Sequence, residues 1–177
     1  MTLRILLPTI CLLYAVLRYN LFGDVSWSQT PLFVLNKAVA LCAAISLATA
    51  ALYGRQGLDG RRYWGGLAFR CAALHVLMSL ILLPSGLFAV LVADQGFTAR
   101  GTIVLLGGVC CAYCFSYMAV KPMVRYLNGL YLFLALHLLF LGLPGWLNPA
   151  DWHGYLPPIS MLCLLLCIFA FGWQRKK

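Results

Sequence analysis

The sequence predicts an all-α integral membrane protein, a six-transmembrane-helix bundle that forms a single domain over residues 1–177. Three observations predict this fold class. Hydrophobic residues make up 63% of the chain and charged residues only 10%, and the mean hydropathy is +0.91. The apolar residues lie in runs of about the length that crosses a bilayer, and short connectors separate these runs. A water-soluble domain of this size could not cover so much apolar surface, so lipid is the expected solvent.

The predicted spans lie near residues 4–22, 31–53, 64–84, 101–120, 125–143 and 155–173. The first begins with Arg4 before an apolar run, as a signal peptide does. No small-residue cleavage site follows, so we expect an uncleaved helix. The second contains a single charge, Lys37, about two turns inside it, and the third and fifth each contain one histidine.

Turn residues mark the connectors between the spans, and no connector is long enough for a soluble domain. These residues are Gly23, Gly54–Gly60, Pro84–Gly86, Pro122, Pro144–Gly145 and Pro157–Pro158. The adjacent glycines in "LLGGVCC" (105–111) lie inside the fourth span instead. We expect them to allow close approach of a neighbouring helix or to leave room for a porphyrin, rather than to break the helix.

The basic residues predict the orientation of the bundle. Most of them lie near the N-terminus, the second and fourth connectors or the C-terminus: Arg4, Arg55, Arg61, Arg62, Arg70, Lys121, Arg125, Arg175, Lys176 and Lys177. The positive-inside rule then predicts that both termini are cytoplasmic. We expect the membrane to be a bacterial inner membrane. The net charge of +9 predicts contact with anionic lipid headgroups and not with nucleic acid, because these residues lie between apolar runs.

The eight cysteines all fall inside apolar segments, at positions 11, 42, 71, 110, 111, 114, 163 and 167. We interpret them as small buried hydrophobic residues rather than as a disulfide framework. "CCAYC" (110–114) could form a soft-metal or redox cluster, but no nearby residue completes a ligand set.

Two histidines carry the functional hypothesis. His75 lies ten residues after Gly65 and His137 lies eleven residues after Tyr126, so a rise of ~1.5 Å per residue places each about 15–17 Å into the membrane. Two spans that run in the same direction thus bring an imidazole to the same level. Ionisable side chains at this depth are costly and indicate function. Facing imidazoles are the axial ligands that a six-coordinate b-type haem requires. The alternative is that each histidine only makes an interhelical hydrogen bond.

A haem also needs cations or hydrogen-bond donors for its anionic propionates. Arg18 and Lys37 are candidates on the outer side, although both could instead extend toward the interface, and Arg61 and Arg62 are candidates on the inner side. His153, beside Trp152 in the outer connector, is expected to be a surface residue in an aromatic belt. An electron exit, a quinone contact or a second haem ligand remain its alternative roles.

The stretch "GRRYWGGLAFRCAALH" (60–75) combines a double arginine, a glycine three residues later and a Leu-His thirteen residues after the second arginine. It resembles the third-helix signature of the ferric-reductase-like transmembrane superfamily, and most of all its MsrQ-type haem-binding membrane subunits. "VLNKAVALCA" (34–43) is similar to the second helix of that family, with Lys37 where a basic residue commonly stands. The resemblance covers roughly residues 30–140.

This resemblance implies that His75 and His137 ligate haem b from opposite faces, and that electrons pass from a cytoplasmic flavin or quinol donor to a partner. Where the wider family has a second histidine about four turns away, this chain has Arg61 and Phe88, so we expect one haem. No flavin or nicotinamide domain follows the last span, so a quinone or flavin would belong to a separate molecule. The chain would then be the electron-transfer subunit of an oxidoreductase, without catalytic residues of its own.

Two other functions are compatible with the sequence. A haem-free scaffold or accessory subunit of a larger complex would fit the short connectors and the near absence of intramembrane acids. A transporter fits less well, because the chain has no evident internal repeat and no carboxylate within a span to bind a cation.

Overall fold

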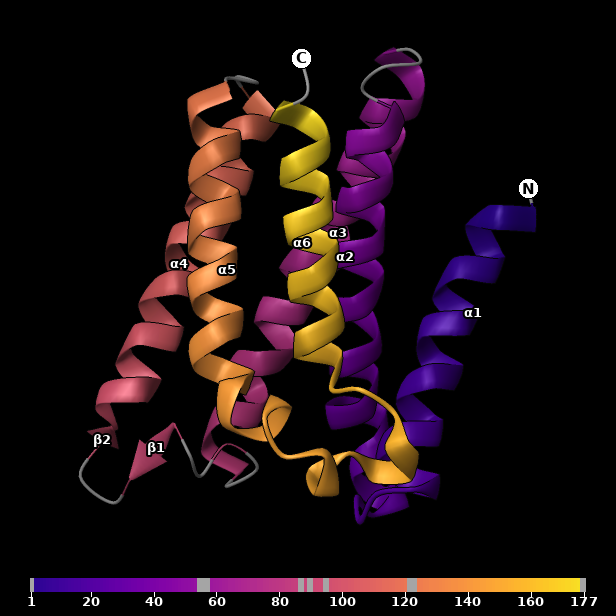
Figure 1. Cartoon of the computed structure of the whole chain (residues 1–177), viewed down its shortest axis with the longest axis vertical. Helices are drawn as coiled ribbons and strands as arrows, with labels where there is room; N and C mark the ends of the chain where they lie inside the picture. The colour runs from indigo at the N-terminus through magenta and orange to yellow at the C-terminus, as the bar shows by residue number, and fades with distance from the viewer. Residues whose placement is uncertain are drawn as a thin grey trace.

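The computed structural model describes residues 2–53, 58–85, 88, 91–93, 96–120 and 124–175. Its six main helices form an antiparallel bundle in which successive helices run in opposite directions (Figure 1). They are α1 (Thr2–Val16), α2 (Leu35–Tyr53), α3 (Leu58–Leu82), α4 (Ala99–Val120), α5 (Val124–Trp146) and α6 (Ile159–Arg175). The prediction of a helical bundle is therefore confirmed.

Short elements occupy the connectors at the lower end of the bundle in Figure 1. They are the π-helices η1 (Leu17–Leu21) and η3 (Thr30–Val34) and the 3-10 turns η2 (Trp27–Gln29), η4 (Leu83–Ser85), η5 (Pro149–Asp151) and η6 (His153–Tyr155). The sequence did not predict the small antiparallel hairpin between α3 and α4, in which β1 (Val92–Ala93) pairs with β2 (Gly96–Phe97).

Length and composition fit a membrane protein. Within the described residues, five helical stretches are long and apolar enough to cross a bilayer: Trp27–Tyr53, Asp59–Ser85, Ala99–Met118, Tyr126–Trp146 and His153–Arg175. The first predicted span corresponds to a shorter apolar helix, Ile5–Leu21. Large apolar side chains such as Leu77, Ile81 and Leu132 are more than half exposed, as expected of a surface that faces lipid.

Two helix boundaries differ from the predicted ones. Helix α3 begins at Leu58, so Arg61 and Arg62 lie in its first turns and not in a connector. Helix α5 continues through Pro144 to Trp146, although proline has no N–H to donate to the carbonyl of Phe140. Arg100 of α4 compensates for this loss, because its Nε donates to the Phe140 carbonyl at 2.5 Å and its Nη2 to the Leu141 carbonyl at 2.7 Å.

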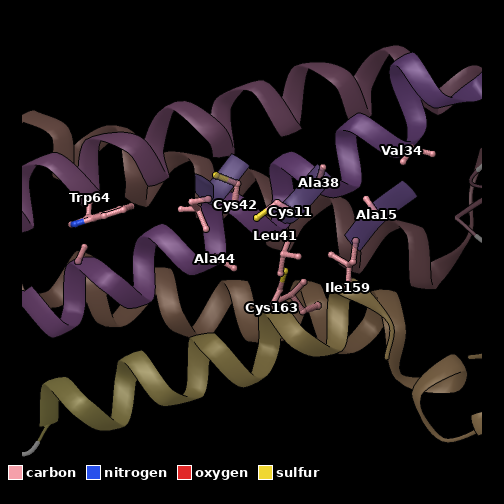
Figure 2. Close-up of a cluster of buried hydrophobic side chains, with 13 residues drawn as sticks. Cys11, Ala15, Val34, Ala38, Leu41, Cys42, Ala44, Trp64, Ile159 and Cys163 are labelled. Atoms are coloured by element: carbon pink, nitrogen blue, oxygen red, sulfur yellow. The ribbon is translucent and has the colours of Figure 1, made fainter. Parts of the chain in front are cut away.

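The core is built largely from small residues. In the first cluster, Cys11 and Ala15 of α1 pack among Ala38 and Cys42 of α2 and Cys163 of α6 (Figure 2). Small side chains let membrane helices approach closely, which replaces the hydrophobic driving force that lipid does not supply. All eight cysteines are free thiols. Six are buried, as expected of small core residues, and two, Cys71 and Cys110, are half-buried.

The connector between α5 and α6 is held by α1 and the π-turn that follows it. Arg18 is only 4% exposed, and its Nη1 donates a hydrogen bond to the carbonyl of Leu156. The hydroxyl of Tyr14 donates to the next carbonyl, that of Pro157, at 2.6 Å. These two contacts join residues about 140 positions apart in the sequence and fix the entry of the chain into α6.

We expect Arg18→Met to lower the free energy of unfolding by about 1–3 kcal/mol, because it leaves the Leu156 carbonyl without its charged donor. Thermal or denaturant unfolding in detergent micelles measures this change. Arg62→Met is the matched control, since Arg62 is exposed. Equal stability of the two variants would contradict the structural role of Arg18.

Candidate functional site

A cavity of about 240 Å³ brings the two intramembrane histidines together. His75 of α3 and His137 of α5 both line it. The other wall residues come from η1, η3, α2, α4 and α6 and from the loop between α3 and α4. Two residues 62 positions apart in the sequence thus line the same cavity.

His75 is oriented by a side chain of the neighbouring helix. Its Nδ1 lies 2.6 Å from Oδ1 of Asn36 on α2, which is fully buried. Asn36 in turn donates from Nδ2 to Oγ of Ser79 at 3.0 Å, and Ser79 lies one turn after His75 on α3. The three side chains form a small polar network in apolar surroundings, and the two bonds occupy both the oxygen and the nitrogen of the Asn36 amide.

His137 is oriented by the main chain. Its Nδ1 lies 2.8 Å from the carbonyl oxygen of Val104 on α4. A carbonyl can only accept, so Nδ1 of His137 carries the proton and Nε2 keeps its lone pair. The same tautomer follows for His75, whose Nδ1 faces an amide oxygen. Within the described part of the chain, no group hydrogen-bonds to Nε2 of either ring.

The glycine pair of α4 makes room for His137. A Cβ atom at Gly107 would lie 3.2 Å from Cβ of His137 and 3.4 Å from its Cα and N, and a Cβ at Gly108 would lie 3.4 Å from Nδ1. Helices α4 and α5 therefore meet closely where the histidine leaves the backbone. The close helix approach expected from "LLGGVCC" is confirmed.

Two cations belong to the same cavity. Lys37 of α2 and Arg100 of α4 line it, and no acidic residue is among its described wall residues. The ammonium of Lys37 lies 5.0 Å from the ring centre of Phe33 and 5.1 Å from that of Phe88. Aromatic faces stabilise such a cation only partly. The cavity thus carries positive charge that its own described walls do not neutralise.

The other predicted cofactor-binding residues lie elsewhere. Arg18 is not among the described residues that line the cavity, and its guanidinium binds the Leu156 carbonyl. Arg61 and Arg62 are exposed in the first turns of α3, roughly 20 Å along the helix from His75. His153 is half-buried in the η6 turn, and it too is absent from the described wall of the cavity.

Sequence analysis missed two site residues. Asn36 precedes Lys37 in the second span, and a buried amide in an apolar helix signals a polar partner. Arg100 directly precedes the fourth predicted span, and no role was predicted for it. Its side chain lies beside α5 because it binds the Phe140 carbonyl, which Pro144 leaves without a main-chain donor. The two residues are 40 positions apart, so the sequence pattern does not reveal this contact.

A second, larger hollow of about 580 Å³ lies against α4 and α5. Its walls include Cys110, Cys114, Tyr113, Tyr126 and Phe133, but neither histidine. Among the described residues, no group of three or more His, Cys, Asp or Glu is arranged to hold a metal ion, so "CCAYC" forms no such cluster there.

No family model matches the sequence, and no curated protein is significantly similar to it.

Gly107→Val should separate α4 from α5 at His137, because the backbone of α5 leaves no space for the added methyl groups. We expect a loss of about 1–3 kcal/mol in the free energy of unfolding, measured by thermal unfolding in detergent. Gly66→Val is the matched control. It makes the same change in helix propensity, but a Cβ atom at Gly66 would have no neighbouring atom within 4 Å. A similar loss in both variants would refute the close contact at Gly107.

Proposed function

We propose that this chain is a membrane b-type haem electron-transfer subunit, with one haem held between His75 and His137. The observation that carries the proposal is the shared cavity, in which imidazoles from α3 and α5 each have Nδ1 occupied by a carbonyl or amide oxygen. Metal-ligating histidines typically donate one ring N–H to such an oxygen and bind the metal through the other nitrogen.

The donor set fits a haem better than a bare metal ion. The described wall residues of the cavity offer two imidazole nitrogens and no carboxylate, too few ligands for a closed site made of protein alone. A porphyrin would bring the four remaining ligands of iron, and the bound group would supply one-electron oxidation and reduction. The protein would contribute the axial ligands, their orientation and apolar walls. The cavity is slightly smaller than typical ligand pockets, so a haem must displace some wall side chains.

Lys37 and Arg100 are the residues that we propose to meet the haem propionates. Both line the cavity with the histidines, and no described acidic residue there competes for them. Arg18 instead serves the α5–α6 connector, and Arg61 and Arg62 lie at the opposite end of α3. The propionates would therefore point toward the end of the bundle that carries the β1–β2 hairpin.

We further propose that α1 with η1 forms a sixth span and that both termini are cytoplasmic, in a bacterial inner membrane. The alternation of helix directions and the clustering of basic residues at one end support this topology. A separate flavin or quinol donor would then deliver electrons from one side, and a partner protein would accept them. Subunits of this kind contribute to an oxidoreductase without binding its substrate.

The reduced-minus-oxidised visible spectrum of the detergent-purified protein, produced with ample haem, tests the ligand assignment. We expect the sharp α-band of a six-coordinate b haem, and its loss in His75→Ala and in His137→Ala. His153→Ala is the matched control and should retain the band. Retention of an unchanged band in both cavity variants would overturn the proposal. A colourless wild-type protein would favour a scaffold, in which the His75–Asn36 and His137–Val104 contacts only join helices.

Haem and its dimethyl ester test the cationic end of the cavity, because the ester lacks the two carboxylates. We expect Lys37→Met to weaken haem binding about ten- to hundred-fold, the equivalent of one charged hydrogen bond, and to leave binding of the ester unchanged. Titration of the haem-free protein, followed by absorbance, measures both affinities. Equal losses for haem and ester would mean that Lys37 supports the fold and does not bind the propionates.

A further inference from the structure

We propose that Asn36 is a positioning residue for His75 and that, with Ser79, it makes the two axial ligands electronically unequal. This inference rests on the proposed haem site and concerns two residues that were not predicted to belong to it. Asn36 is 0% exposed, although an amide inside an apolar helix is costly to bury without partners. Both polar atoms of its side chain hydrogen-bond to residues of α3: Oδ1 to His75 and Nδ2 to Ser79.

Ser79 anchors the Asn36 amide in the arrangement that the structure shows. Nδ2 of Asn36 donates to Oγ of Ser79 at 3.0 Å, and Oδ1 is the atom that faces His75. His75 and Ser79 lie four residues apart on one face of α3, so Asn36 bridges them. In this arrangement Nδ1 of His75 donates to Oδ1 of Asn36, and Nε2 keeps its lone pair.

The two histidines differ in the partner of Nδ1. The His75–Asn36 contact is 2.6 Å, at the short limit for such bonds, and its acceptor is a side chain held by a second hydrogen bond. The His137 contact is 2.8 Å to a main-chain carbonyl. A stronger acceptor on Nδ1 raises the basicity of the imidazole, and a more basic ligand favours the ferric state. His75 is therefore the ligand whose basicity depends on a side chain, so substitutions at Asn36 should change the reduction potential without altering the contact of His137.

Potentiometric titration of the haem-loaded protein tests this inference. In Asn36→Leu the acceptor is removed, and we expect a roughly tenfold weaker preference for ferric iron, which is an upward shift of about 59 mV for a one-electron couple. Haem affinity should fall about ten- to hundred-fold. In Asn36→Asp an anionic acceptor replaces the amide oxygen, and the potential should shift downward. Ser79→Ala releases the amide and should produce a smaller upward shift.

Ser46→Ala is the matched control. Ser46 is also fully buried on α2, and its hydroxyl has no hydrogen-bond partner among the described residues, so its loss should leave the potential unchanged. Opposite shifts in the Leu and Asp variants would support the positioning role, because a purely structural residue would not reverse the sign. Wild-type potentials in Asn36→Asp and Ser79→Ala would overturn it, even if Asn36→Leu does not fold.

A measurement without haem separates this inference from the proposed function. In the haem-free protein, ¹⁵N NMR of His75 should show the Nδ1-protonated tautomer in the wild type and a mixture of tautomers in Ser79→Ala. If the wild-type protein binds haem but its reduction potential is unchanged by the Asn36 and Ser79 substitutions, only the role of Asn36 is overturned. A colourless wild-type protein would overturn the haem proposal and the electronic role of Asn36. If His75 then showed no preferred tautomer, the positioning role would fail as well.

Discussion

Polar groups inside a lipid-solvated bundle are costly to leave unpaired, because no water reaches them there. The structure depends on this constraint where Pro144 interrupts α5 and where the charge of Arg18 is buried. Pro144 frees a carbonyl on α5, and Arg100 of α4 occupies it. Arg18 reaches across the bundle to a carbonyl before α6. Each of these contacts stabilises the fold and also sets the position of one element relative to another.

Small residues allow the helices of the bundle to pack closely. Alanine and cysteine fill the interface of α1, α2 and α6, and the glycine pair of α4 lets α5 approach. Close backbone contact is the main attraction available between helices when lipid is as apolar as the side chains. The cavity lies beside this close packing, and its described wall includes four longer polar residues, namely the two histidines, Lys37 and Arg100.

The candidate site combines neutral bases and cations. Two imidazoles whose Nδ1 atoms are already hydrogen-bonded provide fixed lone pairs, and two cations without a described acidic neighbour provide attraction for an anionic group. The proposed haem, with its propionates, would satisfy both features at once. Neither feature by itself would select a haem, because interhelical histidines and buried cations each occur for structural reasons.

The sequence by itself determined the helical class, the approximate limits of the helices and the burial of the cysteines. These properties follow from local composition: apolar runs of bilayer length can only be helices, and turn residues end them. Sequence also selected His75, His137 and Lys37, because polar residues in apolar runs are conspicuous.

Only the tertiary structure decided which cations accompany the histidines. Arg100 lines the cavity because its guanidinium binds a carbonyl of α5, which also carries His137. Arg18 is absent from the described wall because its guanidinium binds the Leu156 carbonyl in the connector before α6. The partner of His75 was decided in the same way, since Asn36 and His75 meet only when α2 packs on α3. Such pairings arise from the relative rotation and depth of the helices. Hydropathy leaves both undetermined, because lipid solvates every apolar face of a helix equally well.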